Sequence, residues 1–138
     1  MISGSQPISH LPWQVSREEF VAEALDVGPD GACCTFVIDA SIPQSARSGY
    51  AALVIAYARA EEPVYIFSDG SAALLIRDGG TESGKVVAKR IFDQMRRLSL
   101  EGTLRAGIAL LGSDPTAALD ASRAAAEGAE AGTIAVAG

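Results

Sequence analysis

The chain has 138 residues, of which 49% are hydrophobic and 20% charged, the size and composition of one globular domain with its own core. Its net charge of −6 argues against a nucleic-acid-binding protein, because such domains present a basic face. No apolar run approaches the roughly 18 residues of a membrane span, and the first ten residues lack the basic and apolar regions of a signal peptide. We therefore expect one cytoplasmic domain over residues 1–138, with residues 1–8 as an irregular N-terminal segment.

The first half of the chain predicts two helices around one strand. Ser16 is a good N-cap with Glu19 three residues later, which predicts a helix over about residues 16–25. The apolar, β-rich run ACCTFVID, residues 32–39, predicts a central strand. An alanine-rich segment with apolar residues on all sides predicts a buried helix over about residues 45–59.

The cysteines and the histidine are poorly arranged for a metal site. Cys33 and Cys34 are adjacent in the predicted strand, and successive side chains of a strand point to opposite faces. We expect both to be small core residues in a reducing compartment. His10 is the only histidine and has no cysteine at ligand spacing. We therefore predict no cofactor and no metal, with Asp39 only a weak candidate for a metal ligand.

The second half predicts a hairpin and then alternating helices and strands. VYIF and AALLI, at residues 64–67 and 72–76, are joined by the polar link SDGS, which is a hairpin signal. Because a hairpin interrupts an otherwise alternating order, we predict an α+β fold with a mixed sheet. The elements after the hairpin are a helix from Thr81 or Glu82 to Leu98, a strand over 103–111, a helix from Ser113 or Asp114 to Gly132, and a strand over 133–137.

The stretch GGTESGKV, Gly79 to Val86, has the GxxxxGK spacing of a phosphate-binding P-loop. A P-loop needs a hydroxyl after its lysine to bind Mg²⁺, but Val86 follows Lys85 here. The preceding run is also the second arm of the hairpin, whereas a P-loop follows the first strand of a βαβ unit. We interpret the stretch as a strand-to-helix connection with Thr81 or Ser83 as the N-cap.

The order of these elements resembles the GGDEF (diguanylate cyclase) domain over about residues 8–137. SHLPWQVSREEFVAEAL is similar to the family's opening "TGLPNR…F…L", FVIDAS to its strand ending "LLDID", and RAEEPVYIFSDGSAALLI to "RxxD-x5-GGDEF-xxLL". LRAGIALLGSDPTAALDASRAAAEGAEAGTIAV follows the closing "SIGIA…D…LL…AD.AL..AK..G.N.V" pattern. The resemblance implies a nucleotide-cyclase-like domain, with a mostly antiparallel five-stranded central sheet flanked by helices.

The residues that carry catalysis in that family are replaced in this chain. Gly70 stands at the third signature position, where the family has an acidic ligand for Mg²⁺. Asp39 matches the family's strand aspartate, but a two-metal phosphoryl-transfer site needs a second carboxylate beside it. The family's guanine-contacting Asn and Asp have no counterpart in SIPQSARSGY, and its late phosphate-binding Lys and Arg fall on Ala129 and Thr133. The five signature positions correspond to Ser68, Asp69, Gly70, Ser71 and Ala72.

The resemblance therefore implies an inactive domain, not an enzyme, that acts as a regulatory or protein-interaction module in bacterial signalling. A protein partner or a homodimer is expected, with no nucleic acid and no membrane. A further hypothesis, besides this one and the sensor described next, is a remote enzyme of the nucleotide-cyclase or polymerase-palm type. It would use Asp39 and Asp69 with a metal.

The alternative function is a sensor of cyclic di-GMP or another nucleotide. In the family, an RxxD placed five residues before the signature binds the cyclic dinucleotide product, and here that spacing gives RAEE, from Arg59 to Glu62. A guanidinium can contact phosphate or a guanine edge, and a carboxylate can accept hydrogen bonds from guanine. The competing interpretation is an ordinary helix end, where an arginine complements the helix dipole.

Overall fold

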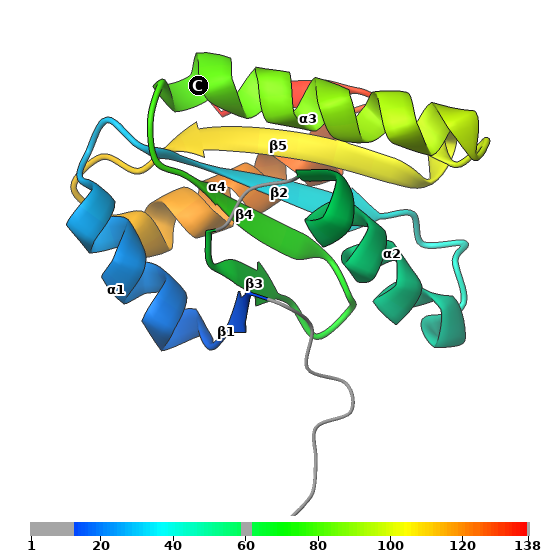
Figure 1. Cartoon of the computed structure of the whole chain (residues 1–138), viewed down its shortest axis with the longest axis horizontal. Helices are drawn as coiled ribbons and strands as arrows, with labels where there is room; N and C mark the ends of the chain where they lie inside the picture. The colour runs from blue at the N-terminus through cyan, green and yellow to red at the C-terminus, as the bar shows by residue number, and fades with distance from the viewer. Residues whose placement is uncertain (1–12, 59–61, 138) are drawn as a thin grey trace, which may run out of the picture.

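The computed structural model describes residues 13–58 and 62–137, in which helices cover both faces of a six-stranded sheet (Figure 1). The elements are β1 (Gln14–Val15), α1 (Arg17–Val27), β2 (Ala32–Ile38), α2 (Gln44–Ala58), β3 (Val64–Ile66), β4 (Ala72–Ile76), α3 (Gly80–Arg97), the 3-10 helix η1 (Glu101–Thr103), β5 (Leu104–Leu110), α4 (Pro115–Gly128) and β6 (Ile134–Val136). The predicted order of helices and strands is confirmed, with two short elements, β1 and η1, in addition.

The sheet has the strand order β1-β3-β4-β2-β5-β6. The pairings of β3 with β4, β4 with β2 and β2 with β5 are antiparallel, and the two outer pairings are parallel. The mixed, mostly antiparallel sheet is confirmed, but the prediction of five strands was wrong. The sixth strand is β1, whose two residues pair with Val64 and Tyr65 of β3. A strand of two residues is too short to show a hydrophobic periodicity in the sequence. It is recognised as a strand only through its pairing with β3.

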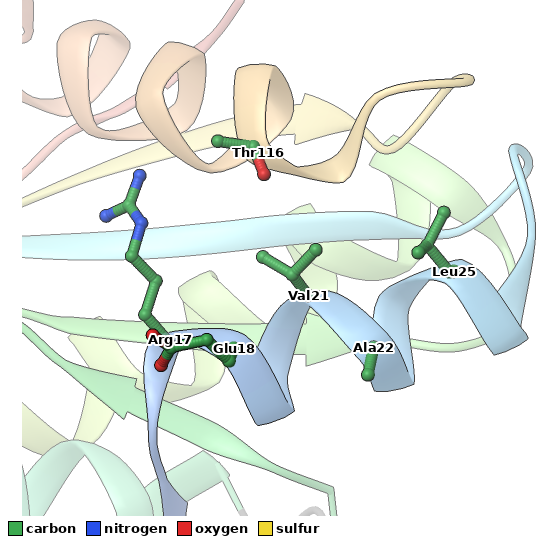
Figure 2. Close-up of a pocket in the computed structure, with 6 residues that line it drawn as sticks. All are labelled: Arg17, Glu18, Val21, Ala22, Leu25 and Thr116. Atoms are coloured by element: carbon green, nitrogen blue, oxygen red, sulfur yellow. The ribbon is translucent and has the colours of Figure 1, made fainter.

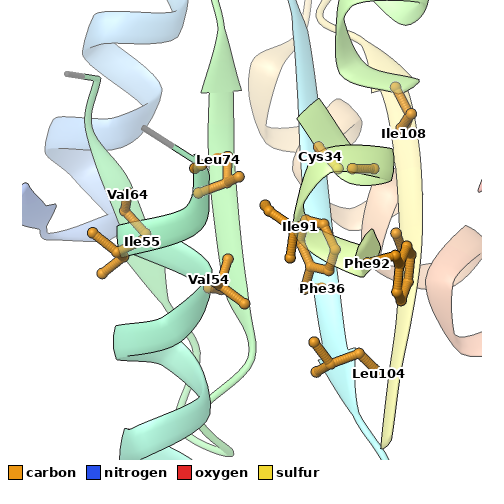
Figure 3. Close-up of a cluster of buried hydrophobic side chains, with 14 of the residues drawn as sticks. Cys34, Phe36, Val54, Ile55, Val64, Leu74, Ile91, Phe92, Leu104 and Ile108 are labelled. Atoms are coloured by element: carbon orange, nitrogen blue, oxygen red, sulfur yellow. The ribbon is translucent and has the colours of Figure 1, made fainter. Parts of the chain in front are cut away.

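The core lies on both faces of β2, all of whose residues are buried. On one face, α2 and α3 pack over the sheet (Figure 3). The ring centroids of Phe36 and Phe92 lie 5.6 Å apart in this cluster. On the other face α1 and α4 cover a second cluster. Cys33 and Cys34 enter opposite clusters, as predicted, and burial raises the pKa of both thiols.

Helix α4 lies unusually close to β5 at Gly107. A Cβ atom at this position would overlap the backbone oxygen of Ser122 and the backbone nitrogen of Ala126, and would lie 3.0 Å from the Cα of Ala126. The buried hydroxyl of Ser122 also forms a 2.7 Å hydrogen bond with that of Thr35 on β2. These contacts set the position of α4, which carries an arginine to the hairpin described below.

The connection after β4 differs from its prediction in one detail. Helix α3 begins at Gly80, and its N-cap is Gly79 in the left-handed conformation with φ of 87°, not Thr81 or Ser83. A side chain at Gly79 would overlap the hydroxyl of Ser83. β4 runs antiparallel to both neighbouring strands, and Lys85 is exposed and forms an ion pair with Glu82, so this stretch lacks the geometry of a P-loop.

One further expectation was wrong in detail, and another lies outside the described residues. Helix α4 ends at Gly128 instead of Gly132, because Ala129 is extended and Gly132 donates a backbone hydrogen bond to Leu104 at the start of β5. The irregular segment expected over residues 1–8 lies outside the described residues. Within the described part of the chain, no helix is long and apolar enough to cross a bilayer.

Candidate functional site

The loop of the β3–β4 hairpin runs from Phe67 to Ser71 and is closed by backbone hydrogen bonds. The amide of Gly70 donates to the oxygen of Phe67 at 2.9 Å, and the amide of Phe67 donates to the oxygen of Ser71 at 2.8 Å. Gly70 has φ of 89°, which disfavours any residue with a side chain. A Cβ atom there would also lie 2.8 Å from the Cβ of Arg47 on α2. The loop therefore requires glycine at the position that the resemblance assigns to a carboxylate.

Arg47 holds the hairpin tip against the end of β2. Its Nε donates to the carbonyl oxygen of Ile42 at 3.2 Å, and its two terminal nitrogens donate to those of Asp69 and Asp39 at 3.1 Å each. One guanidinium thus joins the hairpin, the end of β2 and the β2–α2 connection. The carbonyl oxygen of Asp39 also accepts a 3.1 Å hydrogen bond from the amide of Ile42, whereas Arg47 is the side chain that reaches the carbonyl groups of Ile42 and Asp69 in this partly buried position.

A groove of about 420 Å³ lies between the N-terminal part of α2 and the hairpin. Its polar lining consists mainly of neutral side chains, among them Gln44, Ser45, Ser48 and Ser68. Arg47 is the only charged residue among those described that line it. Without a carboxylate, the groove is unsuited to a divalent cation, which prefers anionic oxygen ligands.

The carboxylate of Asp39 lies at the end of β2 and is held by its own neighbours. It accepts hydrogen bonds from the hydroxyl of Ser41 at 2.5 Å and from the Ser41 amide at 3.1 Å. Arg105 on β5 lies 3.3 Å from its other oxygen. The hydrogen bonds from Ser41 lower the pKa of Asp39, and the charge of Arg105 adds to this effect.

The carboxylate of Asp69 at the hairpin tip is held by α4. Arg123 donates to it at 2.6 Å while lying over the ring of Phe67, 4.5 Å from the ring centroid. The amide of Ser71 adds a 3.0 Å hydrogen bond. Partial burial raises the pKa of Asp69, but the hydrogen bonds from Arg123 and Ser71 outweigh it and lower that pKa to about 2.

The two aspartates therefore face different arginines, and each already has hydrogen-bond donors. No group of three or more His, Cys, Asp or Glu side chains suited to a metal occurs within residues 13–58 and 62–137. The metal-dependent arrangement of Asp39 and Asp69 considered from the sequence has no support in these contacts. The residues that are present do not fit the Mg²⁺ that the resemblance implies.

The dinucleotide site expected at Arg59 and Glu62 can be described only in part. Arg59 lies outside the described residues. Glu62 accepts two hydrogen bonds of 2.9 Å from Arg77 at the end of β4, and Arg77 also lies 3.6 Å from Glu23 on α1. A ligand that uses Glu62 would have to break this ion pair, and binding at Arg59 and Glu62 stays a prediction.

Arg47 and Arg123 are the residues that sequence reasoning missed. Arg47 is the only charged residue of α2 and lies near its N-terminus, where a cation opposes the helix dipole. Such an unfavourable position is a signal that the side chain has a specific partner. Arg123 carries no comparable signal, because an arginine in an alanine-rich helix is ordinary at the surface.

Substitution of Asp69 by Asn is expected to lower the free energy of unfolding at neutral pH by about 1 kcal/mol. This figure allows for solvent screening of a side chain that is 36% exposed. The folded pKa of about 2 lies below the unfolded value of about 3.9, so the stabilisation is present above about pH 4 and is lost as the pH falls towards 2. Urea unfolding at several pH values measures this, and an equal pH dependence in Asp69→Asn and the parent chain would contradict it.

Two solved structures of one protein from Pseudomonas aeruginosa share the fold. The GGDEF domain of TpbB (YfiN) from Pseudomonas aeruginosa, in a truncated form that comprises only this domain, has a TM-score of 0.68 and 17% identity, over 96% of this chain and 94% of that one. A crystal structure of the same domain has a TM-score of 0.68 and 18% identity, over 95% of this chain and 99% of that one. No family model matches the sequence, and no curated protein matches it. The chain therefore has the fold of a GGDEF domain.

Proposed function

Starting from the GGDEF fold, we propose that this chain is a catalytically inactive GGDEF-like domain that serves as a regulatory or protein-interaction module in bacterial signalling. The observation that carries the proposal is the position of Arg47. Its guanidinium bonds to the carbonyl oxygens of Asp39 and Asp69, at the end of β2 and the tip of the hairpin. It therefore places a fixed positive charge at the two segments that would have to supply metal ligands.

A divalent cation at this place would meet two obstacles. It would be repelled by Arg47 and would need carbonyl oxygens that already accept hydrogen bonds from that side chain. It would also lack a carboxylate from the third signature position, because Gly70 adopts a backbone conformation that favours glycine. Phosphoryl transfer depends on metal ions to neutralise the charge that develops on the phosphates, so a site of this kind supports no cyclase step.

The rest of the fold is built as a stable domain. Both faces of the sheet are covered by continuous buried clusters, and the hairpin is tied to helices on both sides through Arg47 and Arg123. A domain that keeps its scaffold while its reactive positions are filled by structural contacts is suited to recognition. This supports an interaction role in place of turnover.

Incubation of the purified chain with GTP and either Mg²⁺ or Mn²⁺ is expected to yield no cyclic dinucleotide. Chromatography of the nucleotides measures this, with an active diguanylate cyclase as the positive control. Asp39→Asn is the matched variant, because it removes the one carboxylate that matches the family's metal aspartate. Product that appears with the parent chain and disappears with Asp39→Asn would overturn the proposal, whereas equal traces in both would come from a contaminating enzyme.

A further inference from the structure

The charges of the helices are divided between the two faces of the sheet. On one face, α2 and α3 together carry six basic and two acidic residues, whereas on the other face α1 and α4 carry two basic and six acidic residues. The net charge of −6 for the whole chain does not reveal that basic and acidic helices lie on different faces. The helices on one face of the sheet are therefore net basic, and those on the other face are net acidic.

Each of these sides also presents an exposed apolar side chain. Val86 on α3 and Leu25 on α1 are 62% and 61% exposed, the highest values among the large hydrophobic residues that the structure describes. Lys89 and Arg97 follow Val86 at helical spacing on the exposed side of α3, and neither forms an ion pair within the described residues. The exposed side of α3 thus carries an apolar side chain next to two cations that form no ion pair within the described residues.

A shallow groove of about 370 Å³ lies between α1 and α4 on the opposite side. Val21 and Leu25 project from α1 towards Thr116 on α4 and form its apolar part (Figure 2). Arg17 and Glu18 both line it, and Arg17 is paired at 2.9 Å with Asp120 on α4, whose side chain is 66% exposed. The groove is therefore apolar, its one lining cation is already paired, and the two helices that form it carry an excess of acidic residues, which complements the basic α3 side.

We propose that copies of this chain associate head to tail, with α3 of one copy in the α1–α4 groove of the next. Val86 then packs against Leu25 and Val21, and Lys89 and Arg97 of the same copy face the acidic residues of α1 and α4. The two surfaces lie on opposite faces of one sheet, so each copy that binds leaves both kinds of surface free at the ends of the assembly. Such a heterologous contact does not close on itself as a twofold dimer does.

This inference deepens the proposed interaction role, on which it rests, by naming a second copy as the partner. The measured mass of the wild-type chain is expected to rise with protein concentration in low salt and to fall back in about 1 M salt, where the Debye length is about 3 Å. Sedimentation velocity measures this. A mass that stays that of a monomer up to about 1 mM in low salt, a concentration at which even a weak contact is populated, would overturn the inference.

Two single substitutions distinguish this contact from a symmetric one. Leu25→Asp removes the groove, and Val86→Asp removes the α3 surface, so each variant alone is expected to be monomeric. An equimolar mixture keeps one intact groove and one intact α3 surface and is expected to form a dimer and nothing larger. A mixture that remains monomeric, or single variants that still associate, would overturn the proposal.

Trp13→Asp beside the edge strand β1 is the matched control, because Trp13 is also exposed but belongs neither to α3 nor to the residues that line the groove. It is expected to associate as the wild type does. Lys89→Glu combined with Arg97→Glu tests the same contact without touching an apolar residue, and circular dichroism verifies that each variant is folded. Since GTP turnover is measured separately, the failure of self-association and the failure of the proposed inactivity are distinguishable.

Discussion

Gly107→Ala is expected to destabilise the protein by about 3 kcal/mol or more, because the added methyl group meets backbone atoms. The added Cβ would overlap backbone atoms of Ser122 and Ala126 in α4. Backbone atoms cannot rotate away as a flexible side chain does, so α4 must move off β5. That movement would also break the buried hydrogen bond between Ser122 and Thr35. Urea unfolding followed by circular dichroism measures the loss.

Gly49→Ala is the matched control for this prediction. Gly49 lies inside α2, and a Cβ atom there would meet nothing within 4 Å. The substitution is expected to stabilise the protein by about 0.5–1 kcal/mol, because glycine is a poor helix former. The same substitution of glycine by alanine should thus raise the free energy of unfolding at Gly49 and lower it at Gly107. Equal effects at Gly49 and Gly107 would contradict the close contact between α4 and β5.

Arg47→Met is expected to lower the free energy of unfolding by about 2 kcal/mol and to loosen the hairpin. Methionine keeps much of the apolar length of the side chain but removes the donors to the carbonyl oxygens of Asp39, Ile42 and Asp69. The carbonyl oxygen of Asp39 keeps the amide of Ile42 as a donor, but those of Ile42 and Asp69 lose the guanidinium, and leaving partly buried acceptors without donors costs about 1–3 kcal/mol. Denaturant unfolding measures the stability, and hydrogen exchange of the Gly70 amide measures the opening of the loop.

The control for Arg47 is Arg97→Met, which removes an exposed guanidinium at the end of α3 and is expected to change stability by less than about 0.5 kcal/mol. Arg47→Lys should not rescue the loss, because one ammonium group cannot reproduce the planar fork that reaches three carbonyl groups. A lysine variant as stable as the parent chain would show that charge alone, and not the directed hydrogen bonds, holds the hairpin.

The local elements could be predicted from the sequence because their signals are local. Ser16 and Glu19 form the capping box that starts α1, since both partners lie within one helical turn. The polar link before Ala72 marks the hairpin for the same reason. The apolar run of β2 indicated a central strand, and helices on both faces explain why that run does not alternate with polar residues.

The candidate site was predicted only where one residue is informative by itself. Gly70 at a signature position indicated a missing carboxylate, and the hairpin geometry adds that glycine is required there. The partners of Asp39 and Asp69 were not predictable. Arg105 and Arg123 lie far along the chain from these aspartates, and their approach depends on how β5 and α4 pack.

The sequence by itself determined the order of the main elements, the buried central strand and the presence of a glycine, Gly70, at the position that the resemblance assigns to a carboxylate. Caps, turns and periodicity act over a few residues, so they can be read without knowing the fold. Only the tertiary structure decided that β1 joins the sheet, that α4 ends at Gly128, and that Arg47 bonds to the carbonyl groups beside the hairpin. These features depend on segments that are distant in the sequence, and packing alone brings them together.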